Sequence, residues 1–205
     1  MSRRISLRFA VSTVAMLLFA APTLADLPFS FSMASENGAI PDDDIAVFLL
    51  TMDAAHSDLA PAPPFPMPAI TSLEVVVTGL VHSDADDLDI YLIDPLGHTL
   101  NLMTDRGVGS AINASLIFND SASGLPPENG PIASGAYQPE GAGGLSKYYG
   151  NGGGTSAWIL LVIDDSPGGE GSLQGFTLRG TYVPEPVTLS LLALGAVAVL
   201  RRRHA

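Results

Sequence analysis

The stretch "LEVVVTGLVHSDADDLDIYLID" (residues 73–94) contains two short runs of β-forming residues on either side of an acidic turn. In each run the apolar side chains recur at every second position, which is the period of a β-strand that is buried on one face. The stretch therefore predicts two strands, with one face formed by Leu73, Val75 and Val77 in the first and by Leu88, Ile90 and Leu92 in the second.

Similar runs continue along the chain. They are short, rich in β-formers and bounded by Gly, Pro, Asp or Asn. Between residues 26 and 183 no stretch has the length and 3.6-residue period of an amphipathic helix. We therefore expect an all-β fold, an antiparallel β-sandwich or jelly roll. The other expected strands are residues 45–51, 98–103, 112–118, 157–163 and 175–182.

Three segments lack this pattern. Residues 26–44 are expected to lead into the domain without a strand of their own, and residues 56–69 hold five prolines, which favour an extended loop. Residues 119–156 form a long Gly-rich loop, either functional or loosely ordered. By contrast, residues 157–163 are apolar on both faces, which predicts a central strand covered on both sides, with Trp158 in the core.

The charge of the chain is segregated. All 21 acidic residues lie between Asp26 and Glu185, and only Arg106, Lys147 and Arg179 are basic in that part. Such a domain repels phosphate backbones, so we expect no nucleic-acid partner. The chain has no cysteine, which excludes disulfides, zinc–thiolate sites and cysteine nucleophiles.

No catalytic motif is present. The sequence lacks a Gly-x-Ser-x-Gly elbow, a His-Glu-x-x-His pair, a P-loop and a dinucleotide fingerprint. His82 is next to Ser83 and Asp84, but triad groups normally converge from separate elements, so we interpret His82 as a strand-end residue that hydrogen-bonds a turn. The expectation is a protein that is not an enzyme.

Two acidic clusters are candidates for a calcium site. The first cluster, in residues 84–89, stands at the start of the expected strand 88–94, and the second, in residues 164–171, follows the expected strand 157–163. In antiparallel neighbours the start of one strand lies beside the end of the next. Calcium prefers six to eight oxygen ligands from flexible loops. The alternative is that these are solvated turn acids in an acidic protein. The candidate ligands are Asp84, Asp86, Asp87, Asp164, Asp165 and Glu170.

Both ends of the chain have the composition of targeting segments. Residues 1–25 combine three arginines, an apolar run and small residues before Asp26, which predicts a signal peptide; an N-terminal anchor is the alternative. Residues 187–200 contain no charge and precede three arginines. A helix of that length is short for a bilayer, and the arginines would stay in the cytoplasm.

The middle of the chain resembles the P domain, the β-sandwich that follows the catalytic domain of proprotein convertases. The resemblance covers residues 73–182 and lies in the order of a strand with a His, an Asp-Leu strand, a Pro-x-Gly turn, a Tyr-rich loop, the strand of Trp158 and a closing strand. Asp86 and Phe176 depart from the pattern. The resemblance implies a β-sandwich that in convertases supports a neighbouring domain, and some P domains bind calcium.

The tail resembles the PEP-CTERM sorting signal of Gram-negative bacteria. The match consists of Val183, Pro184, Glu185 and Pro186, the apolar run, and the cluster Arg201, Arg202 and Arg203. It implies cleavage by an exosortase-type membrane protease, a transient stay in the inner membrane, and a final place at the cell surface or in a biofilm matrix rich in exopolysaccharide. A plain C-terminal anchor is the alternative.

The expected organisation is a signal peptide (1–25), a P-domain-like sandwich (26–183) and a sorting signal (183–205). The expected function is that of an exported, non-enzymatic surface or matrix protein that acts by binding or structure. The alternatives are an accessory module that stabilises a secreted protease, and a hydrolase with an unrecognised site.

Overall fold

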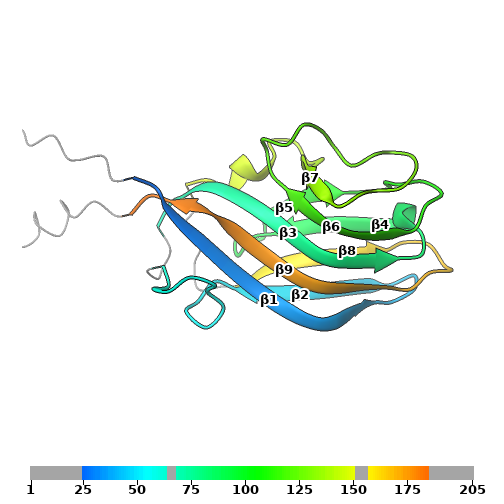
Figure 1. The fold of residues 1–205 in the computed structure, drawn as a ribbon, viewed down its shortest axis with the longest axis horizontal. Helices are drawn as coiled ribbons and strands as arrows, with labels where there is room; N and C mark the ends of the chain where they lie inside the picture. The colour runs from blue at the N-terminus through cyan, green and yellow to red at the C-terminus, as the bar shows by residue number, and fades with distance from the viewer. Residues whose placement is uncertain (1–24, 64–67, 151–156, 185–205) are drawn as a thin grey trace, which may run out of the picture. The chain divides into compact units, whose positions relative to one another are not determined.

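The computed structural model describes residues 25–63, 68–150 and 157–184. The strands in these ranges form two sheets that face each other (Figure 1). One sheet has the order β1 (Leu27–Ile40), β9 (Gly171–Tyr182), β3 (Ile70–His82), β6 (Ile112–Phe118) and β7 (Gly135–Tyr137). The other has the order β2 (Ile45–Thr51), β8 (Ala157–Asp164), β4 (Leu88–Ile93) and β5 (Thr99–Met103).

The expected all-β class is confirmed. Strand pairs are antiparallel except that β7 runs parallel to β6, and the helical turns of the described ranges are the 3-10 turns η1 (Ala85–Asp87) and η2 (Leu145–Tyr148). The alternation in the opening stretch also holds, because the inward positions of β3 and β4 are fully buried. The core lies between the sheets, where burial of apolar surface stabilises the sandwich.

The leading segment is a strand, contrary to the expectation of irregular structure over residues 26–44. As β1, it pairs with β9 from Leu27 opposite Tyr182 to Ile40 opposite Gly171. Phe29 and Phe31 point into the core. β1 was missed because it is an edge strand whose other face is polar, and because its Asn and Gly have low β-propensity.

The long loop at 119–156 also contains structure that the sequence analysis missed. β7 pairs with β6 and so adds a strand to the five-stranded sheet. The two carboxylate oxygens of Asp120 accept hydrogen bonds from backbone amides of η2, from Leu145 at 2.7 Å and from Ser146 at 2.8 Å. The hydroxyl of Tyr148 donates to the carbonyl of Leu92 at 3.0 Å. The described part of this loop is therefore fastened to both sheets.

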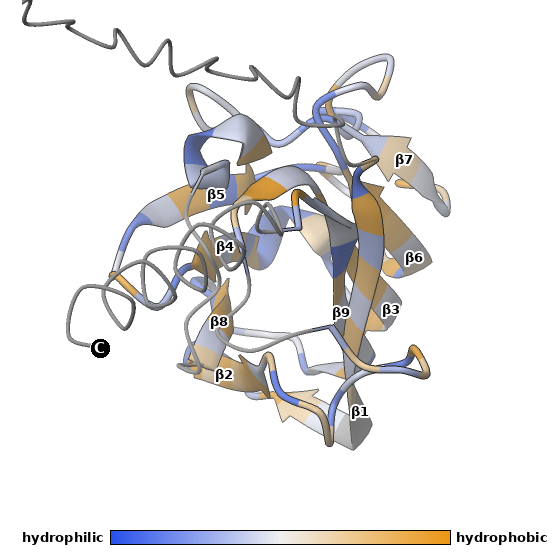
Figure 2. Cartoon of the chain, turned by 90° about the vertical axis from the view of Figure 1, so that its left-hand side faces the viewer, coloured by the Kyte–Doolittle hydropathy of each residue, from blue (hydrophilic) through white to orange (hydrophobic). Residues whose placement is uncertain are grey.

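The central place of β8 is confirmed, with Trp158 2% exposed and packed edge-on against Tyr148. The expected cover on its outer face is wrong: Ile159, Leu161 and Ile163 are only half-buried, and no described segment forms a layer over them. The row beside them on β2 is more exposed, at 52–54%, and consists of Ile45, Val47 and Leu49. β2 and β8 both carry strongly hydrophobic residues (Figure 2).

The predicted loop after β2 is confirmed for its described part. It follows β1, since the amide of Ser32 donates to the carbonyl of His56 at 3.0 Å. No helix in the described ranges is long and apolar enough to cross a membrane. Residues 1–24 of the predicted signal peptide, Glu185, Pro186, the apolar run 187–200 and Arg201–Arg203 lie outside the described residues.

Candidate functional site

A buried, hydrogen-bonded histidine–aspartate pair lies at one end of the sandwich, where β3, β4 and β8 meet. His82 ends β3 and Asp164 ends β8, and both side chains are fully buried. The His82 Nε2 atom is 3.0 Å from Asp164 Oδ2, and the Nδ1 atom is 2.5 Å from the carbonyl oxygen of Asp84. The interpretation of His82 as a strand-end residue bonded to a turn is therefore confirmed.

The two ring nitrogens of His82 both face oxygen atoms. A neutral imidazole has one N–H and can donate to only one of them. Nδ1 is also an acceptor for the backbone amide of Asp84 at 3.3 Å, so a ring that donates from Nε2 to Asp164 is still hydrogen-bonded to this turn. The structural role of the pair is to join the ends of β3 and β8 to the turn that begins β4.

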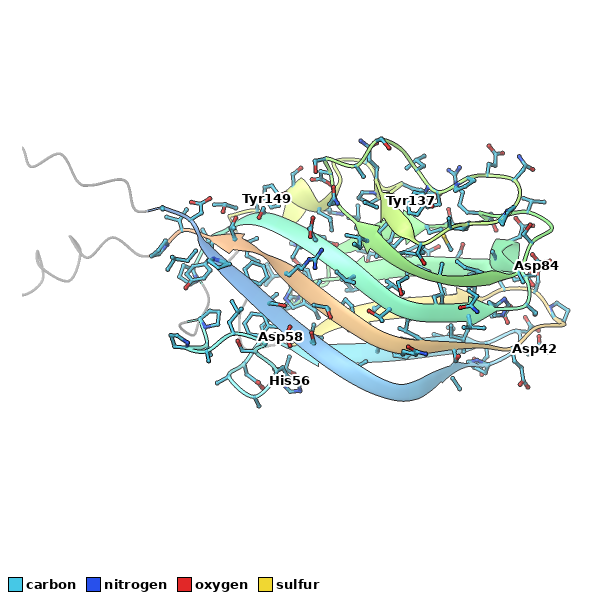
Figure 3. All side chains as sticks on the ribbon, viewed as in Figure 1. Asp42, His56, Asp58, Asp84, Tyr137 and Tyr149 are labelled. Atoms are coloured by element: carbon cyan, nitrogen blue, oxygen red, sulfur yellow. The ribbon has the colours of Figure 1, made fainter. Side chains whose placement is uncertain are left out.

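A group of mutually close aspartates lies in and beside the turns at this end of the sandwich. We define the acidic rim as Asp84, Asp86, Asp87, Asp89, Asp105 and Asp165. The predicted meeting of the two clusters occurs, because Leu88 is paired with Asp164 and the amide of Asp165 donates to the carbonyl of Asp87 at 3.0 Å. Asp84 caps η1 by accepting from the amide of Asp86, and lies at the same end of the sandwich as Asp42 (Figure 3).

Three rim carboxyls, those of Asp86, Asp87 and Asp89, have a raised pKa. Burial is the largest cause for Asp86 and Asp87, and Asp84 and Asp165 add repulsion to both. Burial likewise raises the pKa of Asp89. Because these folded-state pKa values lie above the unfolded ones, the folded state binds more protons in that range, so the rim's contribution to stability increases as pH falls through the raised pKa.

Two of the predicted calcium ligands do not take part in the rim. Asp164 uses both carboxylate oxygens internally, for His82 and for the amide of Ser166, and Glu170 is exposed and is not among the groups that shift the pKa of Asp86 or Asp87. Within the described ranges, no three acidic or histidine side chains lie close enough together to hold a metal ion as they stand.

Two acids at this end, Asp42 and Asp105, lie outside the predicted clusters, and Asp89 belongs to the predicted cluster Asp84–Asp89 but was not among the predicted ligands. Asp89 and Asp105 are parts of the rim, and one carboxylate oxygen of Asp89 is buried without a hydrogen-bond partner in the described structure. Asp42 accepts from the amides of Gly168 and Gly169 at 2.7 and 3.2 Å and so holds the β8–β9 turn. Asp42 and Asp105 reach this end only through the tertiary fold.

The three described histidines each contact an aspartate. Besides the buried pair, His56 and His98 lie 2.8 Å from Asp53 and Asp94. In the described part of the chain no Ser, Thr or Tyr hydroxyl forms a hydrogen bond with any of these rings. The geometry therefore offers no activated hydroxyl nucleophile of the triad type among these residues.

A groove of about 510 Å³ lies on the outer face of the five-stranded sheet. Its floor carries Ser30, Arg179 and Glu74, which are side by side in register on β1, β9 and β3. Leu59 lines one side and Tyr149 the other. In Figure 3, Asp58 and Tyr149 flank these three strands. We call this feature the sheet groove.

No family model matches the sequence, and no curated protein matches it. Among solved structures, the chain is similar to a chain in the crystal structure of the Aeromonas sobria serine protease complexed with a chaperone, at 14% identity and a TM-score of 0.47 over 80% of this chain. It is also similar to the Aeromonas sobria serine protease alone, at 14% identity and a TM-score of 0.45 over 78% of this chain. This chain covers 28% of the length of each of those chains.

Proposed function

We propose that this chain is an exported, non-enzymatic binding protein of a Gram-negative cell surface or extracellular matrix. A P-domain-like sandwich does the binding. The signal peptide exports it, the C-terminal helix holds it briefly in the inner membrane, and an exosortase-type protease then releases or transfers it outward. The observation that carries this proposal is the order Val-Pro-Glu-Pro, apolar run and arginine cluster directly after an all-β domain.

The end of β9 is compatible with cleavage at this motif. Tyr182 is buried and pairs with Leu27, and the amide of the next residue, Val183, still donates to the carbonyl of Ala69 at 3.0 Å. Val183 is itself 37% exposed. The motif thus begins where the sheet ends, and a cut within or after it leaves every described strand intact. The prolines disfavour helix there, and an extended segment suits a protease.

Changing Glu185 to Ala should leave export unaffected but keep the protein in the inner membrane with its tail uncut. The reason is that the substitution alters the motif and neither the signal peptide nor the arginine cluster. Mass spectrometry of the matrix and membrane fractions of producing cells measures the result. Replacing Glu128, an exposed acid away from the motif, by Ala is the control and should be processed normally.

Recovery of surface protein that still contains Arg203 would contradict this proposal and leave a plain membrane anchor. Replacing Arg201–Arg203 with Ser tests a different step, because it should weaken the orientation of the helix rather than recognition of the motif.

We further propose that the acidic rim takes up calcium. The support is electrostatic: the carboxylates of Asp84 and Asp165 repel those of Asp86 and Asp87 in the folded state, and a divalent cation would relieve that repulsion. The residues that would hold it are Asp84, Asp86, Asp87 and Asp165, whose oxygens are the hard ligands calcium prefers. This property is separate from sorting.

Calcium at 100 times its dissociation constant should stabilise the full chain by about 2.7 kcal/mol. Asp87→Asn should remove most of that gain, whereas Glu128→Asn should keep it because residue 128 is outside the rim. The measurement is the midpoint of thermal unfolding with and without millimolar calcium, after chelation. A midpoint that calcium does not move would show that the rim acids are only solvated.

A second candidate function is that of an accessory module for a secreted protease, as the resemblance to P domains suggests. The supporting observation is the apolar outer face of the four-stranded sheet, where Ile45, Val47 and Leu49 are each more than half exposed. Aliphatic residues exposed side by side favour a protein partner. Val47→Asp should then abolish co-purification of a secreted protease and shorten the half-life of that protease, whereas Thr78→Asp, on an exposed position of the other sheet, should not.

A further inference from the structure

The sheet groove has the size and lining of a ligand site. Its volume, about 510 Å³, lies within the roughly 300–1,000 Å³ of typical sites, which combine apolar walls with a few placed polar groups. The apolar groups are Leu59, Pro28 and the ring of Tyr149, and the polar groups come from Glu74, Arg179 and Asn119.

The polar groups of the groove are held in position but keep capacity for a ligand. Arg179 donates from Nε to Glu74 at 2.7 Å, and its terminal guanidinium nitrogens have no further hydrogen bond in the described structure. Asn119 accepts at its side-chain oxygen from Ser121, and its side-chain nitrogen Nδ2 has no partner in the described structure. The floor therefore presents both donors and acceptors.

The aromatic wall is rigid and uncharged. Tyr149 packs against the core cluster, and burial raises the pKa of its hydroxyl, with the Asp120 carboxylate adding to the effect. On the opposite side, Ser30 and Ser32 donate to Asp58 at 2.5 and 2.7 Å, which fixes the loop that carries Leu59. The groove is thus built between two fastened loops.

We infer that the sheet groove binds a neutral saccharide chain. Sugar rings present an apolar C–H face, which suits Tyr149, and hydroxyl edges, which suit paired donors and acceptors such as those of Arg179, Glu74 and Asn119. An acidic polymer is disfavoured because Asp58 and Asp120 flank the groove in a strongly acidic domain. An extended peptide is disfavoured because β9, the floor strand, is paired on both sides and offers no free edge.

This inference rests on the proposed function in taking the protein to act by binding, and it names the class of ligand. It does not depend on cleavage of the tail. A test on purified chain therefore separates the two: processing is followed in cells, and saccharide binding is followed in solution.

The test titrates the full chain, in a detergent without a sugar headgroup, with cellohexaose, maltohexaose and laminarihexaose by calorimetry. At least one should bind, and Arg179→Ala and Tyr149→Ala should each weaken that binding by about tenfold or more. Lys147→Ala and Tyr137→Ala, which replace residues outside the groove, should bind as the parent does. Arg179 is half-exposed, so its variant reports on binding even if Tyr149→Ala fails to fold.

Absence of binding to all three hexasaccharides would overturn the inference. So would binding that Arg179→Ala leaves unchanged. Polygalacturonate and an extended apolar peptide complete the panel, and tighter binding of either one through the groove would assign it to an acidic polymer or to a peptide instead.

Discussion

Replacing His82 by Ala should lower the free energy of unfolding by about 3–5 kcal/mol, the usual cost of leaving a buried charged group without its partner. The reason is that the carboxylate of Asp164, whose residue is 1% exposed, would lose its partner in the interior. The turn at Asp84 would lose its hydrogen bond from the ring as well. Urea unfolding of the full chain, followed by far-UV circular dichroism, measures the change.

The double variant His82→Leu with Asp164→Leu separates loss of the pair from loss of volume. It removes both buried polar groups, so it should recover most of the lost stability. His56→Ala is the matched control, because His56 also contacts an aspartate but with its side chain 41% exposed, and it should change stability little. If His82→Ala were as stable as the parent, the buried pair would contribute nothing to the fold.

Replacing Gly180 by Ala should destabilise the sandwich by about 3 kcal/mol or more, since overpacking of a filled site costs about 1–3 kcal/mol and a backbone atom cannot move away as a side chain does. A Cβ atom on Gly180 would lie 1.9 Å from the carbonyl oxygen of Ser72. Here β9 passes β3 at a register shift between Ile70 and Ser72. Relieving the contact would require β3 and β9, two paired interior strands of the five-stranded sheet, to move apart.

Gly124→Ala is the control for this variant, because its Cβ would meet no atom within 4 Å. It should keep or slightly raise the unfolding midpoint, as Gly→Ala does where the backbone tolerates it. Equal midpoints for the Gly180 and Gly124 variants would contradict the close approach of β9 to β3. Both proteins are compared by thermal unfolding in the same buffer.

The local alternation of apolar and polar residues was sufficient to predict a strand and its inward face where only one face of that strand is buried. The alternation in β3, β4 and β8 predicts their inward residues, because a strand with period two can place only one set of side chains in the core. It failed for β1, where serines, Asn and Gly obscure the signal of Phe29 and Phe31. That segment becomes a strand because β9 offers it a long antiparallel edge.

The acidic rim was found in part from the sequence. The ends of β4 and β8 meet as antiparallel neighbours must, which brought Asp87 and Asp165 together as expected. The burial of Asp164 against His82 was not foreseen, because the sequence does not show whether an aspartate at the end of a strand is buried or exposed. The sheet groove was not foreseen either, because its lining comes from six separated parts of the chain.

By itself the sequence determined the all-β class, the inward faces of the main strands, the segregation of charge and the absence of cysteine chemistry, because each of these follows from residue type and short-range period. Only the tertiary structure decided which strands share a sheet, which acids are buried, and where Arg179, Glu74 and Tyr149 form a groove. Those features depend on contacts between residues far apart in the chain, such as Glu74 and Arg179, which are separated by 105 positions. Such contacts arise when two sheets pack to bury a common core, and no local pattern encodes them.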